Sequence, residues 1–218
     1  MRKFSLAADM ERVRTLYEYE DKLRAQGYNL IAGVDEAGRG SLIGPVVVAA
    51  VILPADLYLE RLDDSKKLSA KVREDLYEKI CSVAISKNFV RVEAAEVDRL
   101  NVYQATLEGM KRAVAGLDVK PDFVLTDAMT VDFDGIPTLP IVHGDRLSAS
   151  IAAASIIAKV TRDSFADDWA RKYPGYGFEH NRGYGTAEHL AAIEKLGACP
   201  IHRRSFNPVK SLGGTKTD

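Results

Sequence analysis

The chain has 218 residues, of which 46% are hydrophobic and 28% charged, with a formal net charge of −1 at pH 7. This length and composition are typical of a globular protein with a full hydrophobic core. The most apolar run, residues 46–53, is too short to cross a bilayer, which argues against a membrane protein. The near-neutral total charge gives no general sign of nucleic-acid binding.

Three local features of the sequence bear on the location and the partners of the protein. The N-terminus leads into charged residues rather than an apolar stretch, so no signal peptide is visible. Cys81 and Cys199 lie far apart without a partner motif, which is typical of reduced thiols, and we expect a cytoplasmic protein. Basic residues near the C-terminus form either a local face for phosphates or ordinary solvated charge: Arg171, Lys172, Arg182, Arg203, Arg204 and Lys210.

The first elements are a helix and a hairpin. Helical spacing of apolar residues over 8–26, ended by Gly27, predicts an N-terminal helical extension over residues 1–27, ahead of a main domain over residues 28–218. Residues 31–35 and 46–53 are predicted strands separated by a glycine-rich turn, so they are expected to form a hairpin.

After the hairpin, helices and strands alternate, which predicts an α/β sheet with mixed strand directions. Small residues early in the longest helix would let it pack close to the sheet. The predicted elements are a helix from Ser69 to residue 80, a strand over 89–92, a helix over 101–114, strands over 123–126 and 140–142, a helix over 148–172, a glycine- and aromatic-rich loop over 175–185, and a helix from Thr186 to residue 196.

Three of the apolar strands lead into acidic residues. Asp35 and Glu36 end the first, Asp127 ends another, and Asp145 follows the last. Side chains at strand ends converge in α/β sheets, and converging carboxylates repel one another unless cations neutralise them. Oxygen ligands without His or Cys suit Mg²⁺ or Mn²⁺. Each acid taken singly is better explained as a solvated loop carboxylate or a helix cap, but the set predicts a metal site.

Adjacent residues of a regular strand point to opposite faces. Asp35 and Glu36 can therefore serve one site only if the strand bends or ends there, and we expect Asp35 to be the more central ligand. Of the neighbouring acids, Asp132 and Asp134 are assigned to a solvated loop, and Asp163 to a salt bridge within a helix.

The segment Gly-Val-Asp-Glu-Ala-Gly-Arg-Gly at 33–40 resembles the opening signature of type 2 ribonucleases H, the bacterial ribonuclease HII group. The resemblance extends over roughly residues 28–209. Further segments follow in the family's order: 64–68 (DSKKL), 101–106, 143–145 (HGD), 152–163 (AAASIIAKVTRD), 183–186 (GYGT) and 200–206 (PIHRRSF).

The resemblance implies a ribonuclease H-like mixed sheet flanked by helices, with a C-terminal helical extension. It implies that Asp35, Glu36, Asp127 and Asp145 bind Mg²⁺ or Mn²⁺. The implied enzyme is an endonuclease that hydrolyses the RNA strand of RNA–DNA hybrids and cuts at ribonucleotides embedded in duplex DNA. Two cations would activate a water and stabilise the departing oxygen, leaving 3′-hydroxyl and 5′-phosphate ends. We expect a monomer that binds such duplexes and no membrane.

The resemblance also assigns substrate-binding residues. Gly38-Arg39-Gly40 lacks bulky side chains at its glycines, so its backbone can approach a ligand, and in the family this segment contacts the 2′-hydroxyl. The tyrosine matching Tyr184 senses the RNA-to-DNA junction. Ser65 and Lys66 resemble phosphate contacts. Without the resemblance, a tight turn, a packed tyrosine and a polar turn explain these residues equally well or better.

Two positions depart from the family pattern. The family usually has glycine where this chain has Ala128, and lysine is common where His143 stands. A neutral imidazole supplies less positive charge beside carboxylates than lysine does, so these changes bear on metal affinity.

Three other functions fit parts of the sequence. A junction-resolving or integrase-like nuclease would share the fold but cut all-DNA duplexes. A non-catalytic nucleic-acid-binding protein would bind without cleaving. A phosphate-binding ATPase is disfavoured because the chain lacks the Gly-x-x-x-x-Gly-Lys-Ser/Thr loop. His180, His189 and His202 are scattered and are assigned to core or surface roles rather than catalysis.

Overall fold

A five-stranded sheet organises residues 5–212, the part of the chain that the computed structural model describes. The strand order is β3-β2-β1-β4-β5. β1 (Ile31–Ala37) pairs antiparallel with β2 (Val46–Ile52), and β2 pairs antiparallel with β3 (Ser86–Val92). β4 (Phe123–Asp127) lies parallel to β1, and β5 (Thr138–Ile141) lies parallel to β4. The predicted hairpin and the mixed α/β sheet are confirmed.

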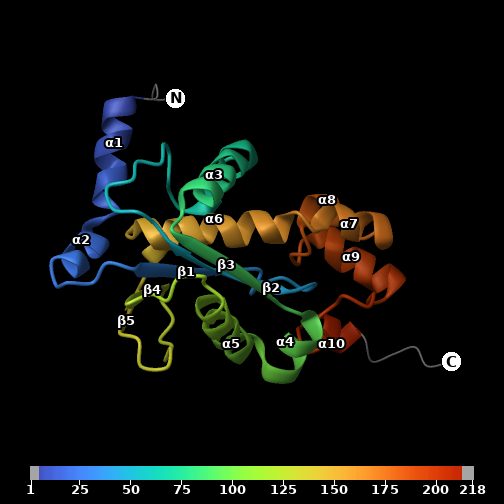
Figure 1. Cartoon of the computed structure of the whole chain (residues 1–218). Helices are drawn as coiled ribbons and strands as arrows, with labels where there is room; N and C mark the ends of the chain where they lie inside the picture. The colour runs from blue at the N-terminus through green and yellow to red at the C-terminus, as the bar shows by residue number, and fades with distance from the viewer. Residues whose placement is uncertain (1–4, 213–218) are drawn as a thin grey trace.

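Helices cover both faces of this sheet (Figure 1). α3 (Ala70–Val83) and α6 (Ala149–Asp163) lie on one face, whereas α4 (Ala94–Leu100) and α5 (Val102–Ala115) lie on the other. The strands divide between two cores because successive side chains alternate. On β2, alternate residues pack toward α3 and α6 (Val47, Ala49, Val51) or toward α4 and α5 (Val46, Val48, Ala50, Ile52).

The expected close packing of α6 on the sheet is confirmed. Ala152, Ala153 and Ala154 are fully buried. A β-carbon at Gly33 on β1 would overlap the backbone of Ser150 at the start of α6. Only glycine at position 33 therefore allows this approach.

The single helix expected over residues 8–26 is wrong. The segment forms α1 (Leu6–Thr15) and α2 (Glu18–Arg24), interrupted at Leu16 and Tyr17. In a continuous helix the Leu16 carbonyl would accept a bond from four residues later. Here it accepts the N–H of Ala149 at the start of α6, over 2.9 Å. Because of this break, the Leu16 carbonyl accepts a hydrogen bond from an N–H in the first turn of α6, which has no partner within its own helix.

The helix expected over residues 148–172 also divides, into α6 and α7 (Ala166–Lys172). The turn between them places the ring of Trp169 against the buried guanidinium of Arg162. The guanidinium carbon lies 5.5 Å from the centroid of the Trp169 ring. α8 (Phe178–Asn181) lies inside the segment expected to be a loop, and α9 (Ala187–Leu196) begins after its cap Thr186 as predicted.

The C-terminal helices form a small core of their own beside the main one. α10 (Val209–Leu212) closes it, and Leu42 and Ile43 from the loop after β1 enter it. Two short 3₁₀ turns, Ser65–Lys67 and Gly144–Arg146, carry further predicted site residues. No helix among residues 5–212 is long and apolar enough to cross a membrane.

Candidate active site

A cleft of about 610 Å³ opens where β1 ends, and eight of the ten predicted site residues line it. Asp127 and Asp145 are not among its lining residues, but both act electrostatically on Asp35 inside it. The predicted residues in the cleft are Asp35, Glu36, Gly38, Arg39, Gly40, Ser65, Lys66 and Tyr184, joined by Ala37, Arg73, Ser155 and Lys159.

Strand pairing places Asp35 beside Asp127. The parallel pairing of β1 with β4 ends at Val34 opposite Thr126, and the next residue on each strand is an aspartate. Neighbouring parallel strands hold equivalent positions at the same level, so the two carboxylates emerge together. Asp35 is buried, and its Oδ1 accepts the N–H of Glu36 over 2.7 Å.

The expected break of the strand at Asp35 and Glu36 is wrong. β1 stays paired with β2 through both residues, Asp35 opposite Ala49 and Glu36 opposite Val48. The two side chains therefore take opposite faces, Asp35 toward α6 and Glu36 toward α5. They lie at the end of the sheet, so both still reach the cleft.

Glu36 is held from one side only. Its Oε1 lies 3.3 Å from Nη1 of Arg39, whereas its Oε2 is buried without a hydrogen-bond partner. A buried carboxylate oxygen without a partner is unfavourable. It is therefore an acceptor available to a cation.

Asp127 and Asp145 are linked through one turn. The N–H of Gly144 donates to Oδ1 of Asp127 over 2.8 Å, and Asp145 is the next residue. Ala128 and His143, the two departures from the family pattern, flank this link with φ of 55° and 59°. Glycine adopts this left-handed region freely, so the alanine at 128 accepts backbone strain beside a proposed ligand.

The acids raise one another's pKa. Burial is the main cause for Asp35, and Glu36, Asp127 and Asp145 add to it, so its pKa lies well above the usual value. Burial raises the pKa of Glu36 despite Arg39, and burial with Asp127 raises the pKa of Asp145. Such a group favours a bound proton or a bound cation.

Lys66 supplies positive charge to this group. Its Nζ lies 3.6 Å from Oδ2 of Asp145. Burial disfavours its charged form, but Asp35, Asp145 and neighbouring acids outweigh this and raise the pKa of Lys66. Asp64 holds the segment in place, because its Oδ1 accepts the N–H of Lys66 and its Oδ2 accepts from Arg146 over 3.1 Å.

Two fully buried arginines brace the loop that contains Gly38-Arg39-Gly40. Arg203 donates from Nη1 to the carbonyl of Arg39 over 2.9 Å. Arg162 donates from Nη2 to Oγ of Ser41 over 2.6 Å, and its guanidinium lies 5.3 Å from the ring centroid of Tyr184. The loop and Tyr184 therefore share one rigid support. Arg203 does not belong to an exposed basic face, so that expectation is wrong for this residue.

The donor set fits a divalent metal ion, although its side chains are not arranged around one. It consists of carboxylate oxygens alone, which suits Mg²⁺ or Mn²⁺, and Glu36 Oε2 lacks a partner. No three Asp, Glu, His or Cys side chains within the described residues 5–212 have a geometry that could hold a metal ion. Asp127, Asp145 and Glu36 are instead turned toward Gly144, Lys66 and Arg39.

The sequence model of the family described as Ribonuclease HII matches residues 32–209. The chain is 52% identical to the ribonuclease HII of Bacillus licheniformis over 94% of this chain and 80% of that protein, and 47% identical to that of Enterococcus faecalis over 97% and 82%. The chain belongs to the ribonuclease HII family. It is a hydrolase that cuts the RNA strand of RNA–DNA hybrids, as predicted, and this family is metal-dependent.

The crystal structure of ribonuclease H2 from Pyrococcus horikoshii supports the same conclusion. It superposes with a TM-score of 0.71 at 28% identity, over 84% of this chain and 96% of that one. The predicted ribonuclease H-like fold is therefore confirmed.

Three polar or charged residues that line the cleft were not singled out from the sequence. Arg73, Ser155 and Lys159 line the cleft. Ser155 and Lys159 lie within a segment already matched to the family, which was the available signal. Asp163 pairs with Lys159 over 2.9 Å, as predicted for a helical salt bridge.

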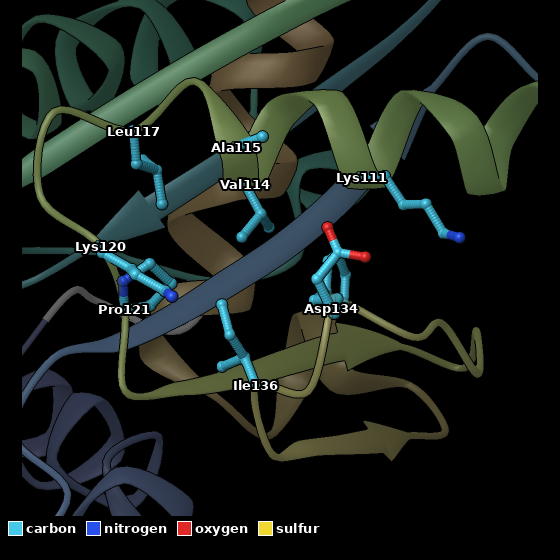
Figure 2. Close-up of a pocket in the computed structure, with 9 residues that line it drawn as sticks. Lys111, Val114, Ala115, Leu117, Lys120, Pro121, Asp134 and Ile136 are labelled. Atoms are coloured by element: carbon cyan, nitrogen blue, oxygen red, sulfur yellow. The ribbon is translucent and has the colours of Figure 1, made fainter.

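A second hollow, of about 280 Å³, lies between α5 and the segments that flank β4 (Figure 2). It has an apolar floor that includes Val114 and Ile136, with Lys111, Lys120 and Asp134 at its rim. It contains none of the predicted site residues, although Asp134 is exposed there as expected.

Proposed function

We propose that this ribonuclease HII cuts DNA duplexes at embedded ribonucleotides as well as RNA–DNA hybrids, and that its active site is the cleft at the end of β1. The observation that carries the proposal is the meeting of Asp35 and Asp127 where β1 and β4 cease to pair, beside a loop whose glycines let a ribose approach. Cleavage leaves 3′-hydroxyl and 5′-phosphate ends.

Asp35, Glu36, Asp127 and Asp145 are the proposed metal ligands. Divalent cations bound there would supply an activated water and charge stabilisation of the leaving oxygen. Both expected kinds of metal ion, Mg²⁺ and Mn²⁺, are consistent with the oxygen-only donor set. Asp127 and Asp145 would exchange their present contacts with Gly144 and Lys66 for the cation.

The remaining cleft residues bind and orient the substrate. A β-carbon placed on Gly40 would have no atom within 4 Å, so the backbone there is open to the ribose 2′-hydroxyl. Lys66, Arg73 and Lys159 place positive charge beside the acids, where the phosphate backbone would pass. Tyr184 offers a ring at the edge of the cleft for the nucleotide at the RNA-to-DNA junction.

We also infer the location of the enzyme, the role of its N-terminal extension and its oligomeric state. Cys81 and Cys199 are free, which is consistent with the cytoplasmic location expected from the sequence. The N-terminal extension over residues 1–27 packs its described part on the catalytic domain, with Val13, Leu16 and Tyr17 in the core shared with α6. We infer that the enzyme acts as a monomer on duplex substrates.

The test is a cleavage assay with Mg²⁺ or Mn²⁺ on three matched duplexes: all-DNA, RNA–DNA hybrid and DNA with one ribonucleotide. The second and third should be cut, and Asp127→Asn should abolish both activities. Asp132→Asn is the matched control, because Asp132 is exposed in a nearby loop. Equal cleavage of the all-DNA duplex would instead indicate a junction-resolving nuclease, and unchanged cleavage by Asp127→Asn would refute the proposed site.

A further inference from the structure

Two histidines form a buried pair behind the loop that carries Tyr184. His189 on α9 is 0% exposed and His202, after α9, is 2% exposed, and their Nε2 atoms lie 3.1 Å apart. The rings of Tyr176 and Phe178 pack around them. Buried polar groups require partners, so the bonds of this pair constrain where its protons lie.

The backbone of Cys199 fixes the arrangement of protons. Three groups of Cys199 surround Nδ1 of His202: its N–H at 2.9 Å, its Sγ at 3.1 Å and its carbonyl oxygen at 3.3 Å. We assign the lone pair to this nitrogen because the N–H is the nearest group and can only donate, so neutral His202 is protonated at Nε2. This Nε2–H donates to Nε2 of His189, whose own proton then lies on Nδ1. Nδ1–H of His189 donates to the carbonyl oxygen of Tyr184 over 3.0 Å. The result is one directional chain of hydrogen bonds that ends on the Tyr184 backbone.

The chain requires both imidazoles to be neutral, because a second proton on either ring would set one N–H against another. The surroundings favour this state. Burial lowers the pKa of His189, and burial with the neighbouring His189 lowers the pKa of His202 to about 4. Glu188 and Arg204 are the charged groups that act on the pair, Glu188 raising the pKa of His189 and Arg204 lowering that of His202.

The same segment also holds the loop after β1. His202 forms a β-bridge with Ile43. The next residue, Arg203, donates to the carbonyls of Arg39 and Gly44 over 2.9 and 3.0 Å. Residues 202 and 203 therefore connect to both proposed ribose-reading elements, to Tyr184 through His189 and to the glycine loop directly.

We propose that His189 and His202 are positioning residues for ribonucleotide recognition, which set the place of Tyr184 relative to Gly38-Arg39-Gly40. Neither histidine lines the cleft, so their effect on substrate passes through the Tyr184 backbone. This inference rests on the proposed function, in which Tyr184 meets the nucleotide at the RNA-to-DNA junction. It predicts an effect on recognition of a single ribonucleotide more than on hydrolysis itself.

The test compares two variants that both lose the contact with His202 and differ in the hydrogen bond to Tyr184. His189→Leu fills the space but removes the donor to Tyr184, whereas His189→Asn keeps an N–H near the position of Nδ1. The readout is the ratio of kcat/KM on a duplex with one ribonucleotide to kcat/KM on a continuous hybrid. Loss of the hydrogen bond to the Tyr184 carbonyl should lower this ratio about tenfold in the leucine variant, chiefly through KM. The asparagine variant should restore most of it.

A second background separates positioning from general stability. In Tyr184→Ala the ratio should already be low, and adding His189→Leu should change it no further. A merely structural role would reduce kcat/KM on both substrates alike and would persist in that background. Thermal unfolding of each variant confirms that it is folded at the assay temperature. His189→Gln is the second variant, because it keeps a polar group facing His202 but places no side-chain donor at the Tyr184 carbonyl, which then accepts only from the Thr186 N–H. It should lower the ratio as leucine does.

An unchanged ratio in both the leucine and glutamine variants would overturn the inference, as would an asparagine variant that fails to restore it. Failure of the wild-type enzyme to cut the single-ribonucleotide duplex would overturn the proposed function instead. The two failures are therefore distinguishable.

Discussion

Nζ of Lys66 lies 3.6 Å from Oδ2 of Asp145, inside the group of acids proposed to bind metal. The ammonium and a divalent cation would compete for the same carboxylates. In the proposed complex, the substrate phosphate would offer Lys66 an alternative partner. In the free enzyme, the pairing of Lys66 with Asp145 would oppose metal binding. In the proposed complex, its pairing with phosphate would favour substrate binding.

Replacing this lysine should separate the two roles. Lys66→Met should strengthen Mn²⁺ binding to the free enzyme about threefold to fivefold, because an ion pair with a largely exposed lysine contributes up to about 1 kcal/mol. It should also raise KM for substrate through the lost phosphate contact. Mn²⁺ titration followed by electron paramagnetic resonance measures the first effect and steady-state kinetics the second. Lys67→Met is the control, because Lys67 pairs with Asp63 over 3.0 Å and not with the proposed ligands. Weaker Mn²⁺ binding in Lys66→Met would show that Lys66 does not compete with the metal.

Glu20 should be a main source of stability at the start of α6. Its Oε1 accepts from Oγ of Ser148, and from the N–H and Oγ of Ser150, over 2.6, 3.0 and 2.5 Å. Glu20→Ala removes the acceptor of the Ser150 N–H and leaves the two hydroxyls only each other, 3.2 Å apart, which should cost about 2 to 4 kcal/mol. For a chain of this size the melting temperature should fall by about 5 to 12 °C. In a thermal melt, Glu18→Ala should stay near the wild type because Glu18 is exposed, and equal melting of the two variants would contradict this role.

Two glycines seven residues apart should respond differently to the same substitution. Gly33→Ala places a β-carbon against the Ser150 backbone and should cost about 3 kcal/mol or more. Gly40→Ala meets nothing within 4 Å, so its melting temperature should match the wild type. Its cleavage of the single-ribonucleotide duplex should nevertheless fall, because the methyl group enters the space proposed for ribose. Full activity in Gly40→Ala would show that the ribose lies elsewhere.

The four acids proposed as metal ligands could be singled out from the sequence because they follow apolar runs that form strands. The geometry of Asp35 and Glu36 could not, since their strand continues only through pairing with Ala49 and Val48 on β2. The break between α1 and α2 depends on α6, whose Ala149 bonds to Leu16 from far along the chain. Such long-range partners leave no periodic signal in the segment itself.

The burial of basic side chains could not be predicted from the sequence either. Arg203 looks in the sequence like part of a basic surface, yet it is fully buried because loop carbonyls at Arg39 and Gly44 accept its hydrogen bonds. Burial lowers its pKa to about 9, well below the usual value. The family motif identified the segment around it, but only the fold shows which side chains of that segment face inward.

The histidine pair should make stability depend on pH. The pKa of His202 is about 4 in the folded chain because burial and His189 disfavour its charge, against an ordinary value of 6.5 for histidine. As pH falls below 6.5, the unfolded chain takes up the proton first, so the free energy of unfolding decreases toward pH 4. The loss from this residue should be about 1 to 2 kcal/mol by about pH 5.

Chemical denaturation at about pH 7 and about pH 5 measures this change. His202→Gln should show a smaller difference between the two pH values than the wild type, whatever its absolute stability. His180→Gln should keep the full difference, because the side chain of His180 is 75% exposed. A pH dependence that is the same in all three proteins would mean that the pair does not titrate as inferred.

Asp35, with Glu36, Asp127 and Asp145, is proposed to bind the metal on which cleavage depends. The most direct measurement compares wild type and Asp35→Asn for Mn²⁺ binding and for cleavage of a single-ribonucleotide duplex in the same samples. We expect weaker Mn²⁺ binding in the variant and a fall in kcat of about a hundredfold or more, with the folded structure retained. Wild-type Mn²⁺ affinity together with wild-type cleavage in Asp35→Asn would rule out Asp35 as a ligand of that metal.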